Sequence, residues 1–354
     1  MSGNLKLNSL VPPTWNRLKV NEYEISLPGD LAIGSAAGAF EAAGAKAVTA
    51  SKGFNDASEF PTGCGRELSE YLESKGASPE AIEINDSKPL LTKIDIKEDS
   101  ADIIRITARE GQVLNILTDI TLASDKKITG IFQLQILAEK NAWVNLTQII
   151  RPGNESTFVN DIGVRLLEGA EINLIQIYAG GAETVSGYRA ELSGEKSISN
   201  VYAGLTMSNR QKLDMNFVLR HTGRQTFSET NVSGALSLEA EKTFRGTIDF
   251  VKGCAGSEGA ENESMLLLDD TVVNKTVPLI LCDEEAVAGS HGASIGRPAD
   301  EMLYYMMSRG ITKENALKIL EKASLDSAAS HIEDEQIKEY AGGVIDSIFN
   351  RSTE

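Results

Sequence analysis

His291 is the residue whose surroundings best suit chemistry, because small residues flank it on both sides in the segment VAGSHGASIG at 287–296. The chain has 3 histidines in all. An imidazole that projects from glycine, alanine and serine is not walled in by neighbouring side chains, which suits a metal ligand or a proton carrier. The alternative is a structural histidine, hydrogen-bonded in a tight passage from a strand to a helix. Both interpretations stay open on this pattern alone.

Soft-metal chemistry is a second possibility, because thiolates and imidazoles both suit iron and iron–sulfur species. The 3 cysteines are far apart and form no CxxC pair, so a disulfide framework or a self-contained zinc site is not expected. Cys254 and Cys282 are candidates to act with His291, or they are small core residues. The other two histidines, His221 and His331, are expected to be solvated or structural.

Two other classes of chemistry find less support. Hydrolysis of polysaccharides needs two carboxyl groups held close together, and the acidic doublets at 269–270 and 284–285 are candidates. Adjacent residues on a strand point to opposite faces, however, so neither doublet is expected to converge on one atom. The sequence contains no G-x-x-x-x-G-K-[ST] loop, so we expect this chain to bind no nucleotide by that route.

Composition limits the partners. Of 354 residues, 34 are Lys or Arg and 51 are Asp or Glu, which gives a formal net charge of −17. Such a field repels phosphate backbones and anionic lipid, so we expect neither nucleic acid nor a membrane surface as a partner. No segment resembles a membrane span, and residues 1–6 do not resemble a signal peptide, so we expect a cytoplasmic protein.

The middle of the chain repeats itself at intervals of about thirty residues. The segments EGQVLNI at 110–116, EKNAWVNL at 139–146 and EGAEINL at 168–174 each join a polar turn to an apolar–polar alternation, and weaker copies follow at 194–198 and 239–244. Alternation with period two is typical of half-buried strands. A sandwich or a propeller is an alternative, but the rung-like spacing and the Glu-Gly and Gly-Glu turns favour the stacked coils of a β-helix.

Helices are expected on both sides of this middle. Residues 65–76 predict a short amphipathic helix. Near the C-terminus Pro298 can serve as a first-turn residue of one helix, Thr312 can cap a second, and a third carries an apolar face over 337–349. We expect these flanking helices also to cap the strand edges at the ends of the solenoid.

These patterns divide the chain into three regions. They are an N-terminal mixed or helical region (1–88), a β-helix core (89–297) and a C-terminal helical region (298–354). The hydrophobic content of 41% is ample to build such a core.

Several segments resemble the SufB/SufD family of iron–sulfur cluster assembly proteins. They are VPLIL at 277–281, SHGASIG at 290–296 and LYYMMSRGI at 303–311, together with LVPPTWNRLKVN at 10–21, which is similar to the N-terminal segment of SufD-type members. With the repetitive middle, the resemblance spans nearly the whole chain. It implies a right-handed parallel β-helix between α-helical ends, in agreement with the repeats.

The resemblance also implies a function and partners. Members of the family assemble nascent clusters in a complex with SufC, an ABC-type ATPase that docks on the C-terminal helices and carries the nucleotide chemistry. His291 then corresponds to the SufD histidine at the interface with SufB, so a transient iron–sulfur cluster or iron would be held between subunits. The residues expected to contact the ATPase are Met302, Tyr305, Met306, Arg309, Leu317 and Leu320.

The chain departs from the family pattern at two places. Many SufD proteins carry a cysteine two positions before the histidine, where this chain has Gly289. The functional SufB cysteine precedes a stretch that is matched here by NESML at 262–266, and no cysteine is present there. SufD-like is therefore the better description, and Cys282 is a candidate for the missing ligand.

We interpret the chain as a SufD-like, non-enzymatic scaffold subunit. It would work with a SufC-like ATPase and pair with a SufB-like subunit or with a second copy of itself as a dimer. The alternatives are a β-helical carbohydrate-active enzyme and a purely architectural solenoid.

Overall fold

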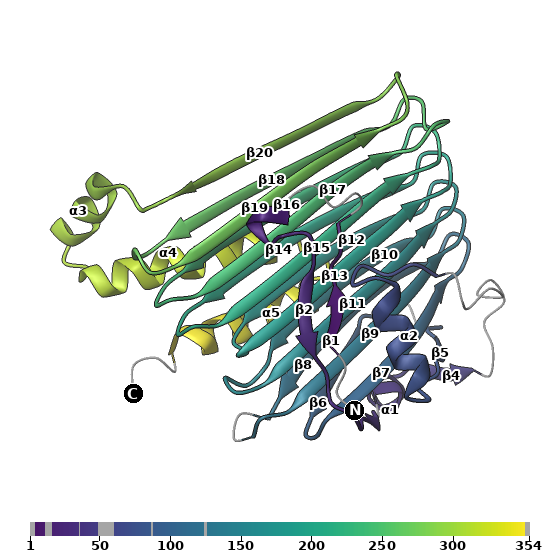
Figure 1. Ribbon diagram of the computed structural model, residues 1–354, viewed down its shortest axis with the longest axis horizontal. Helices are drawn as coiled ribbons and strands as arrows, with labels where there is room; N and C mark the ends of the chain where they lie inside the picture. Colours follow the sequence, from purple (N-terminus) through teal and green to yellow (C-terminus); the bar gives the residue numbers. More distant parts are fainter. Residues whose placement is uncertain are drawn as a thin grey trace.

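The computed structural model describes residues 4–10, 16–34, 36–48, 60–85, 88–123 and 126–350. Its centre is a parallel β-solenoid of about 7 turns, and helices lie on both sides of it in the sequence (Figure 1). The predicted parallel β-helix between helical regions is therefore confirmed. Residues 11–15 of the predicted N-terminal family segment lie outside the described residues.

Each coil contributes one strand to each of two facing sheets. The first sheet has 8 strands in the order β20-β18-β16-β14-β12-β10-β8-β6. Its strands are β6 (Leu90–Ile96), β8 (Val113–Leu122), β10 (Trp143–Arg151), β12 (Glu171–Ala179), β14 (Ile198–Met207), β16 (Phe227–Leu236), β18 (Glu258–Leu267) and β20 (Ala288–Gly296).

The second sheet has 10 strands, in the order β19-β17-β15-β13-β11-β9-β7-β5-β4 with β3 paired to β7. Its strands are β3 (Ala32–Ile33), β4 (Lys46–Val48), β5 (Glu80–Glu83), β7 (Ser100–Ala108), β9 (Thr129–Ala138), β11 (Thr157–Leu166), β13 (Glu183–Leu192), β15 (Lys212–His221), β17 (Glu241–Phe250) and β19 (Val273–Cys282). A separate antiparallel pair consists of β1 (Asn4–Leu7) and β2 (Tyr23–Ser26).

Neighbouring coils stack in register at the predicted interval. Asn145 pairs with Asn115 on one side and with Asn173 on the other. The polar turns repeat a left-handed backbone, with φ of 68° at Gly111 and 63° at Gly169, and each of these two N–H groups donates 2.9 Å to a carbonyl of the next coil. Glycine suits these turns because it has no Cβ to oppose a positive φ.

One predicted repeat falls out of phase. The copies from 110–116 to 194–198 lead into strands of the eight-stranded sheet, whereas the copy at 239–244 leads into β17 of the facing sheet. Both strands of a coil follow a polar turn and alternate with period two, so the two sheets cannot be told apart by this pattern.

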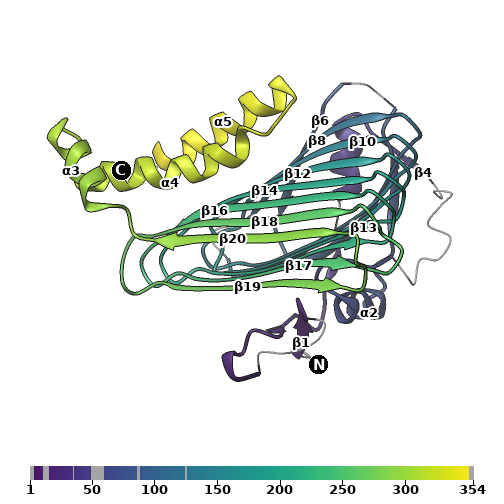
Figure 2. The ribbon, with the colours of Figure 1, turned by 90° about the horizontal axis from the view of Figure 1, so that it is seen from above.

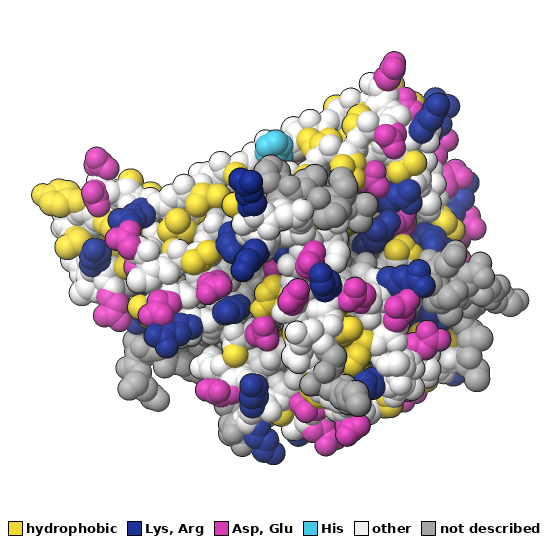
Figure 3. Space-filling view, in the orientation of Figure 1, with side chains coloured by type: hydrophobic (Ala, Val, Ile, Leu, Met, Phe, Trp, Pro, Cys, Tyr) yellow, Lys and Arg dark blue, Asp and Glu magenta, His cyan; other side chains and the backbone are white. Residues whose placement is uncertain are grey.

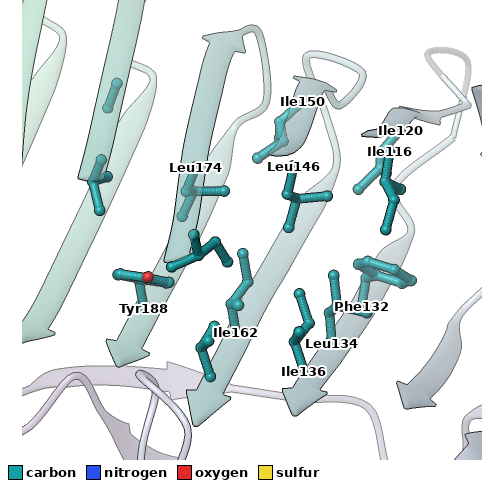
Figure 4. Packing of buried hydrophobic residues seen from close by; sticks show 14 of the residues in the cluster. Ile116, Ile120, Phe132, Leu134, Ile136, Leu146, Ile150, Ile162, Leu174 and Tyr188 are labelled. Atoms are coloured by element: carbon teal, nitrogen blue, oxygen red, sulfur yellow. The ribbon is translucent and has the colours of Figure 1, made fainter. Parts of the chain in front are cut away.

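Apolar side chains fill the space between the sheets and stack in columns. Leu146 lies between Ile116 and Leu174 on neighbouring strands, and Ile162 pairs with Leu134 on the facing sheet (Figure 4). All five are 0% exposed. Burial of each such side chain contributes about 1.5–3 kcal/mol, so these columns are the main source of stability.

The N-terminal region closes one end and one outer face of the solenoid. α1 (Ala36–Ala42) places Phe40, fully buried, in the main core cluster. After a short 3-10 helix, η1 (Asn16–Leu18), and β2, the predicted helix at 65–76 is confirmed as α2 (Arg66–Ser74). Its Leu68 and Leu72 pack with β1 and β2 against the outer face of the ten-stranded sheet.

The three predicted C-terminal helices are confirmed as α3 (Asp300–Ser308), α4 (Lys313–Ala329) and α5 (Glu335–Asn350). Thr312 caps α4 as predicted, because its hydroxyl accepts the Asn315 N–H at 3.2 Å. Pro298 is not in the first turn of α3. Ala299 is the N-cap, so Pro298 lies one residue earlier, where the chain is still extended and needs no helical N–H.

The C-terminal helices cover the outer face of the eight-stranded sheet rather than its end (Figure 2). Leu325, Ile337 and Ile345 pack there against Leu117 and Ile175. The prediction of capping helices is thus right for α1 and wrong for the C-terminal end. The outward side chains of the middle coils are apolar, so covering them removes more apolar surface from water than covering the last coil would.

The contact between α4 and the sheet depends on Gly204 of β14. A Cβ at this position would lie 3.0 Å from Ala328 Cβ and 3.0 Å from Ser324 O. Gly204→Val should lower the free energy of unfolding by about 2–3 kcal/mol, because the added side chain pushes α4 off the sheet. Urea denaturation measures the effect. Gly342→Ala is the control, since a Cβ there meets nothing within 4 Å. Unchanged stability of Gly204→Val would contradict this close approach.

Candidate functional site

The last coil, formed by β19 and β20, is the open end of the solenoid (Figure 2). All of β20 is exposed, and Val277 is the one buried residue of β19. Each of these strands pairs on one side only within the described sheets. β20 contains neither charge nor proline, the usual protections of a free edge. Such an edge is a template for pairing with another chain.

His291 lies on β20 with its side chain on the lumen side. The register aligns Val201, Thr230, Glu261 and His291 on four successive coils. The first three are buried between the sheets, so the fourth member of the column faces the same way. No coil lies above it, and the imidazole is exposed without a hydrogen bond to any described residue. The ring therefore projects freely, and its role as a metal ligand stays a prediction.

The lumen beneath His291 is charged rather than apolar. Lys242, Glu261 and Glu263 are 1, 5 and 3% exposed, and Lys242 forms an ion pair with Glu263. A Cβ on Gly246 would lie 1.7 Å from Glu261 Oε2, so this carboxylate reaches across the lumen to the facing sheet. Burial and then repulsion from Glu263 raise the pKa of Glu261 to about 7, and burial lowers the pKa of Lys242.

Further buried polar atoms at this end have no hydrogen-bond partner in the described structure. They are Thr230 Oγ1, Glu263 Oε2, both amide atoms of Asn274, and Thr276 Oγ1. Register places Asn274 and Thr276 above the lumen residues Lys242 and Phe244. Atoms of this kind also occur in the middle coils, such as Gln148 Nε2. Those at the open end are the ones that a chain docked there would reach.

Cys282 and His291 are not brought together within one chain. Gly289 of β20 faces Ile280 of β19, since a Cβ on Gly289 would lie 3.2 Å from Ile280 Cγ2. Cys282 lies two residues beyond Ile280, on the side of the turn that joins the strands. His291 lies two residues beyond Gly289, on the side away from that turn. Four residues of strand, about 13 Å, therefore separate them along the strand direction. The thiol is exposed and donates 3.1 Å to Glu284 O. Among the described residues, no three His, Cys, Asp or Glu side chains are grouped so that they could hold a metal ion.

The remaining candidate ligands are structural. The His221 ring is buried in the lumen, with Nδ1 2.7 Å from Thr226 Oγ1 and Nε2 2.9 Å from Ser228 Oγ. His331 stacks on Tyr202 with ring centroids 3.6 Å apart. Cys254 is fully buried in a small core cluster, as a core residue would be.

Both acidic doublets lie in turns, so the premise that they are on strands is wrong. Asp269 accepts the N–H of Leu238 at 2.6 Å, and Glu284 accepts the N–H of Gly253 at 2.9 Å. Each of these carboxylates therefore links its turn to the turn of the preceding coil. The geometry gives no support to hydrolysis by paired carboxylates.

Comparison with known proteins identifies the family. Residues 96–324 match the family model described as SUF system FeS cluster assembly, SufBD core domain. This match covers more than half of the chain. The chain belongs to the SufBD family. The resemblance seen in the sequence is confirmed.

Individual SufBD proteins align with part of the chain. The SufD protein of Bacillus subtilis is 24% identical over 191 residues, which are 54% of this chain and 44% of that protein. A SufBD family protein of Synechocystis is 24% identical over 168 residues, 48% of this chain and 35% of that protein. A chloroplastic SufBD family protein of Arabidopsis thaliana is 24% identical over 165 residues, which are 47% of this chain and 30% of that protein. The chain thus spans less than half the length of these relatives.

The first of the C-terminal helices in this SufBD chain contacts α4 but is otherwise open to solvent. α3 buries none of its residues, and Met302 and Tyr305 are 48% and 59% exposed. Met306 is half-buried, and the Arg309 guanidinium lies over the Tyr305 ring at 5.2 Å. Hydrophobic side chains gather on this projecting tip (Figure 3). Such a patch on a helix is typical of a protein-binding surface.

The other predicted contact residues begin α4. Leu317 and Leu320 are half-buried, and Ile319 beside them is 48% exposed. α4 packs on the sheet chiefly through its second half, where Leu325 and Ala328 are buried. The first half therefore continues the apolar surface of α3. No helix in the described ranges is both long and apolar enough to cross a membrane.

Sequence reasoning missed Lys242, Glu261 and Glu263. The signal that could have found them is the alternation in GAENESM at 259–265, where glutamates occupy positions 261 and 263 between Gly259 and Met265. Those four positions share one face of β18, and the face is buried. A charged residue on the core face of a strand is a signal of a polar site in this SufBD chain.

The buried His221 predicts a pH dependence of stability. Burial lowers its pKa to about 4, below the ordinary value of 6.5. The unfolded chain therefore binds more protons between these two values, and the free energy of unfolding should fall by about 3 kcal/mol as the pH drops through this window. Urea denaturation at pH 7 and pH 4 should show a smaller difference for His221→Gln than for the wild type. Equal differences would show that His221 does not carry this dependence.

Proposed function

We propose that the chain is a SufD-like scaffold subunit for iron–sulfur cluster assembly in the cytoplasm, and that it is not itself an enzyme. Family membership supports the assembly system, and the observation that carries the role is His291. Its imidazole lies on the lumen side of the last coil and forms no hydrogen bond to the residues that the structure describes. A scaffold needs such a ligand at a surface that another subunit covers.

The open end pairs with another SufBD chain, either a SufB-like subunit or a second copy. β19 and β20 both have a free edge, and the edge of β20 lacks charge. Pairing would give these backbone groups partners and would cover the unpartnered lumen atoms of Asn274 and Thr276. The interface so formed encloses His291.

Iron or a nascent cluster is the cargo of this interface. The imidazole of His291 binds it, and the facing chain supplies further ligands, since this chain has Gly289 where a cysteine is expected. The exposed thiol of Cys282 is the sulfur ligand that this chain offers. Because about 13 Å of strand separates it from His291, it would act with groups of the facing chain.

A SufC-like ATPase docks on α3 and on the first half of α4. The exposed side chains of Met302 and Tyr305 offer the apolar contact, with Met306, Arg309, Leu317 and Leu320 around them. The second half of α4 packs on β14 and β16. A movement that the ATPase imposes on α3 would therefore reach coils next to the candidate site, while this chain binds no nucleotide.

Replacing His291 tests the scaffold role. Anaerobic reconstitution with iron and sulfide, in the complex with the partner subunits, should give cluster absorption for the wild type and little or none for His291→Ala, because the ligand is lost. Ser294→Ala is a matched control, since this residue is also exposed on β20. Binding of the ATPase should be the same for all three. Normal assembly by His291→Ala would leave a purely architectural solenoid as the better description.

Replacing Met302 tests the docking surface. Met302→Glu should weaken binding of the ATPase about tenfold or more, because it places a charge in the centre of an apolar contact. Isothermal titration calorimetry measures the affinity. Glu314→Gln is the control, an exposed change on α4. Unchanged affinity of Met302→Glu would move the ATPase to another surface.

A further inference from the structure

One buried carboxylate at the open end is left without an ion pair among the described residues. The ion pair of Lys242 and Glu263 neutralises two of the three lumen charges. The third charge is that of Glu261, whose side chain is only 5% exposed. Its carboxylate forms no hydrogen bond or ion pair in the described structure. An isolated carboxylate in such a place is strongly destabilising unless a cation or a proton meets it.

Glu261, which carries this carboxylate, is the residue directly below His291 on the preceding coil. Glu261 and His291 are register partners on neighbouring strands, about 4.8 Å apart in the direction of stacking, and both side chains face the lumen. The missing side chain at Gly246 leaves the space that the carboxylate occupies. Oxygen from a carboxylate and nitrogen from an imidazole are a ligand pair that suits Fe²⁺ and similar divalent ions.

We propose that Glu261 and His291 together form one half of a divalent-cation site for Fe²⁺ at the mouth of the lumen, completed by groups of the chain that faces it. This inference rests on the proposed role of His291 and adds Glu261 as a second ligand from the same chain. The carboxylate gives the bound cation a counter-charge that an imidazole alone does not.

Glu261 and His291 alone provide too few ligands for a divalent cation. Two ligands do not fill the four to six positions of a divalent first-row metal. The unpartnered amide of Asn274 and hydroxyl of Thr276 lie on the lumen side of the same coil as His291, so polar groups of the facing chain have partners here. Affinity for the cation should accordingly rise when the two chains pair.

Metal titration of the assembled complex tests the proposal, with Co²⁺ as a visible probe and Fe²⁺ under anaerobic conditions as the cargo. Glu261→Gln should weaken Co²⁺ binding at least tenfold and change its visible absorption. Glu258→Gln, on the same strand but exposed, should bind as the wild type does. Glu261→His should restore binding, because it supplies another nitrogen ligand, whereas a merely structural carboxylate would not be rescued.

A second variant covers the case in which Glu261→Gln does not fold. Gly246→Ala keeps the charge and displaces the carboxylate, so it too should weaken Co²⁺ binding. Wild-type affinity in Glu261→Gln or, failing that, in Gly246→Ala overturns the inference, and so does a failed rescue by Glu261→His. The scaffold role is judged separately. If Glu261→Gln binds normally while His291→Ala loses both metal and assembly, the proposed function stands without Glu261.

Discussion

Register between successive coils is the constraint on which the rest of this structure depends. Hydrogen bonds between parallel strands hold each residue above its counterpart on the previous coil, and a slip of one residue would exchange lumen and solvent faces along a whole strand. Side-chain amides reinforce the alignment on the outer face, where Asn145 donates to Asn115 at 2.8 Å and Asn173 donates to Asn145 at 3.0 Å. The same alignment puts His291 over Glu261, although they are far apart in the sequence.

The repeat and the helices could be read from the sequence because they are local patterns. The polar turn that contains Gly111 predicts the strand that follows it, and Thr312 predicts the start of α4. What could not be read depends on how distant segments meet. The position of α4 and α5 follows from the outward apolar residues of several coils, such as Ile175. The separation of Cys282 from His291 follows from the direction in which two strands leave one turn. The charge of Glu261 was visible, but its burial required the register.

The two ends of the solenoid differ in a way that bears on function. At the N-terminal end Phe40 seals an apolar core, as a structure that only needs stability would do. At the other end the core gives way to Lys242, Glu261 and Glu263, at a cost in desolvation that apolar side chains would avoid. Conformational specificity or a bound cargo explains such a cost, and this end is also where both sheets end in free edges. The polar lumen and the open coil are thus parts of one site.

The helices packed along the outer face have a consequence for how the rod can vary in length. Each coil touches only its two neighbours, so a solenoid of this kind tolerates the gain or loss of a whole rung, about 4.8 Å of rod each time. Here α4 and α5 cross a fixed span, from Leu91 on β6 to Ser233 on β16. An added rung beneath them would misalign every contact they make. The two helices therefore limit the number of coils beneath them, and they fix the distance between α3 and the open end of the lumen.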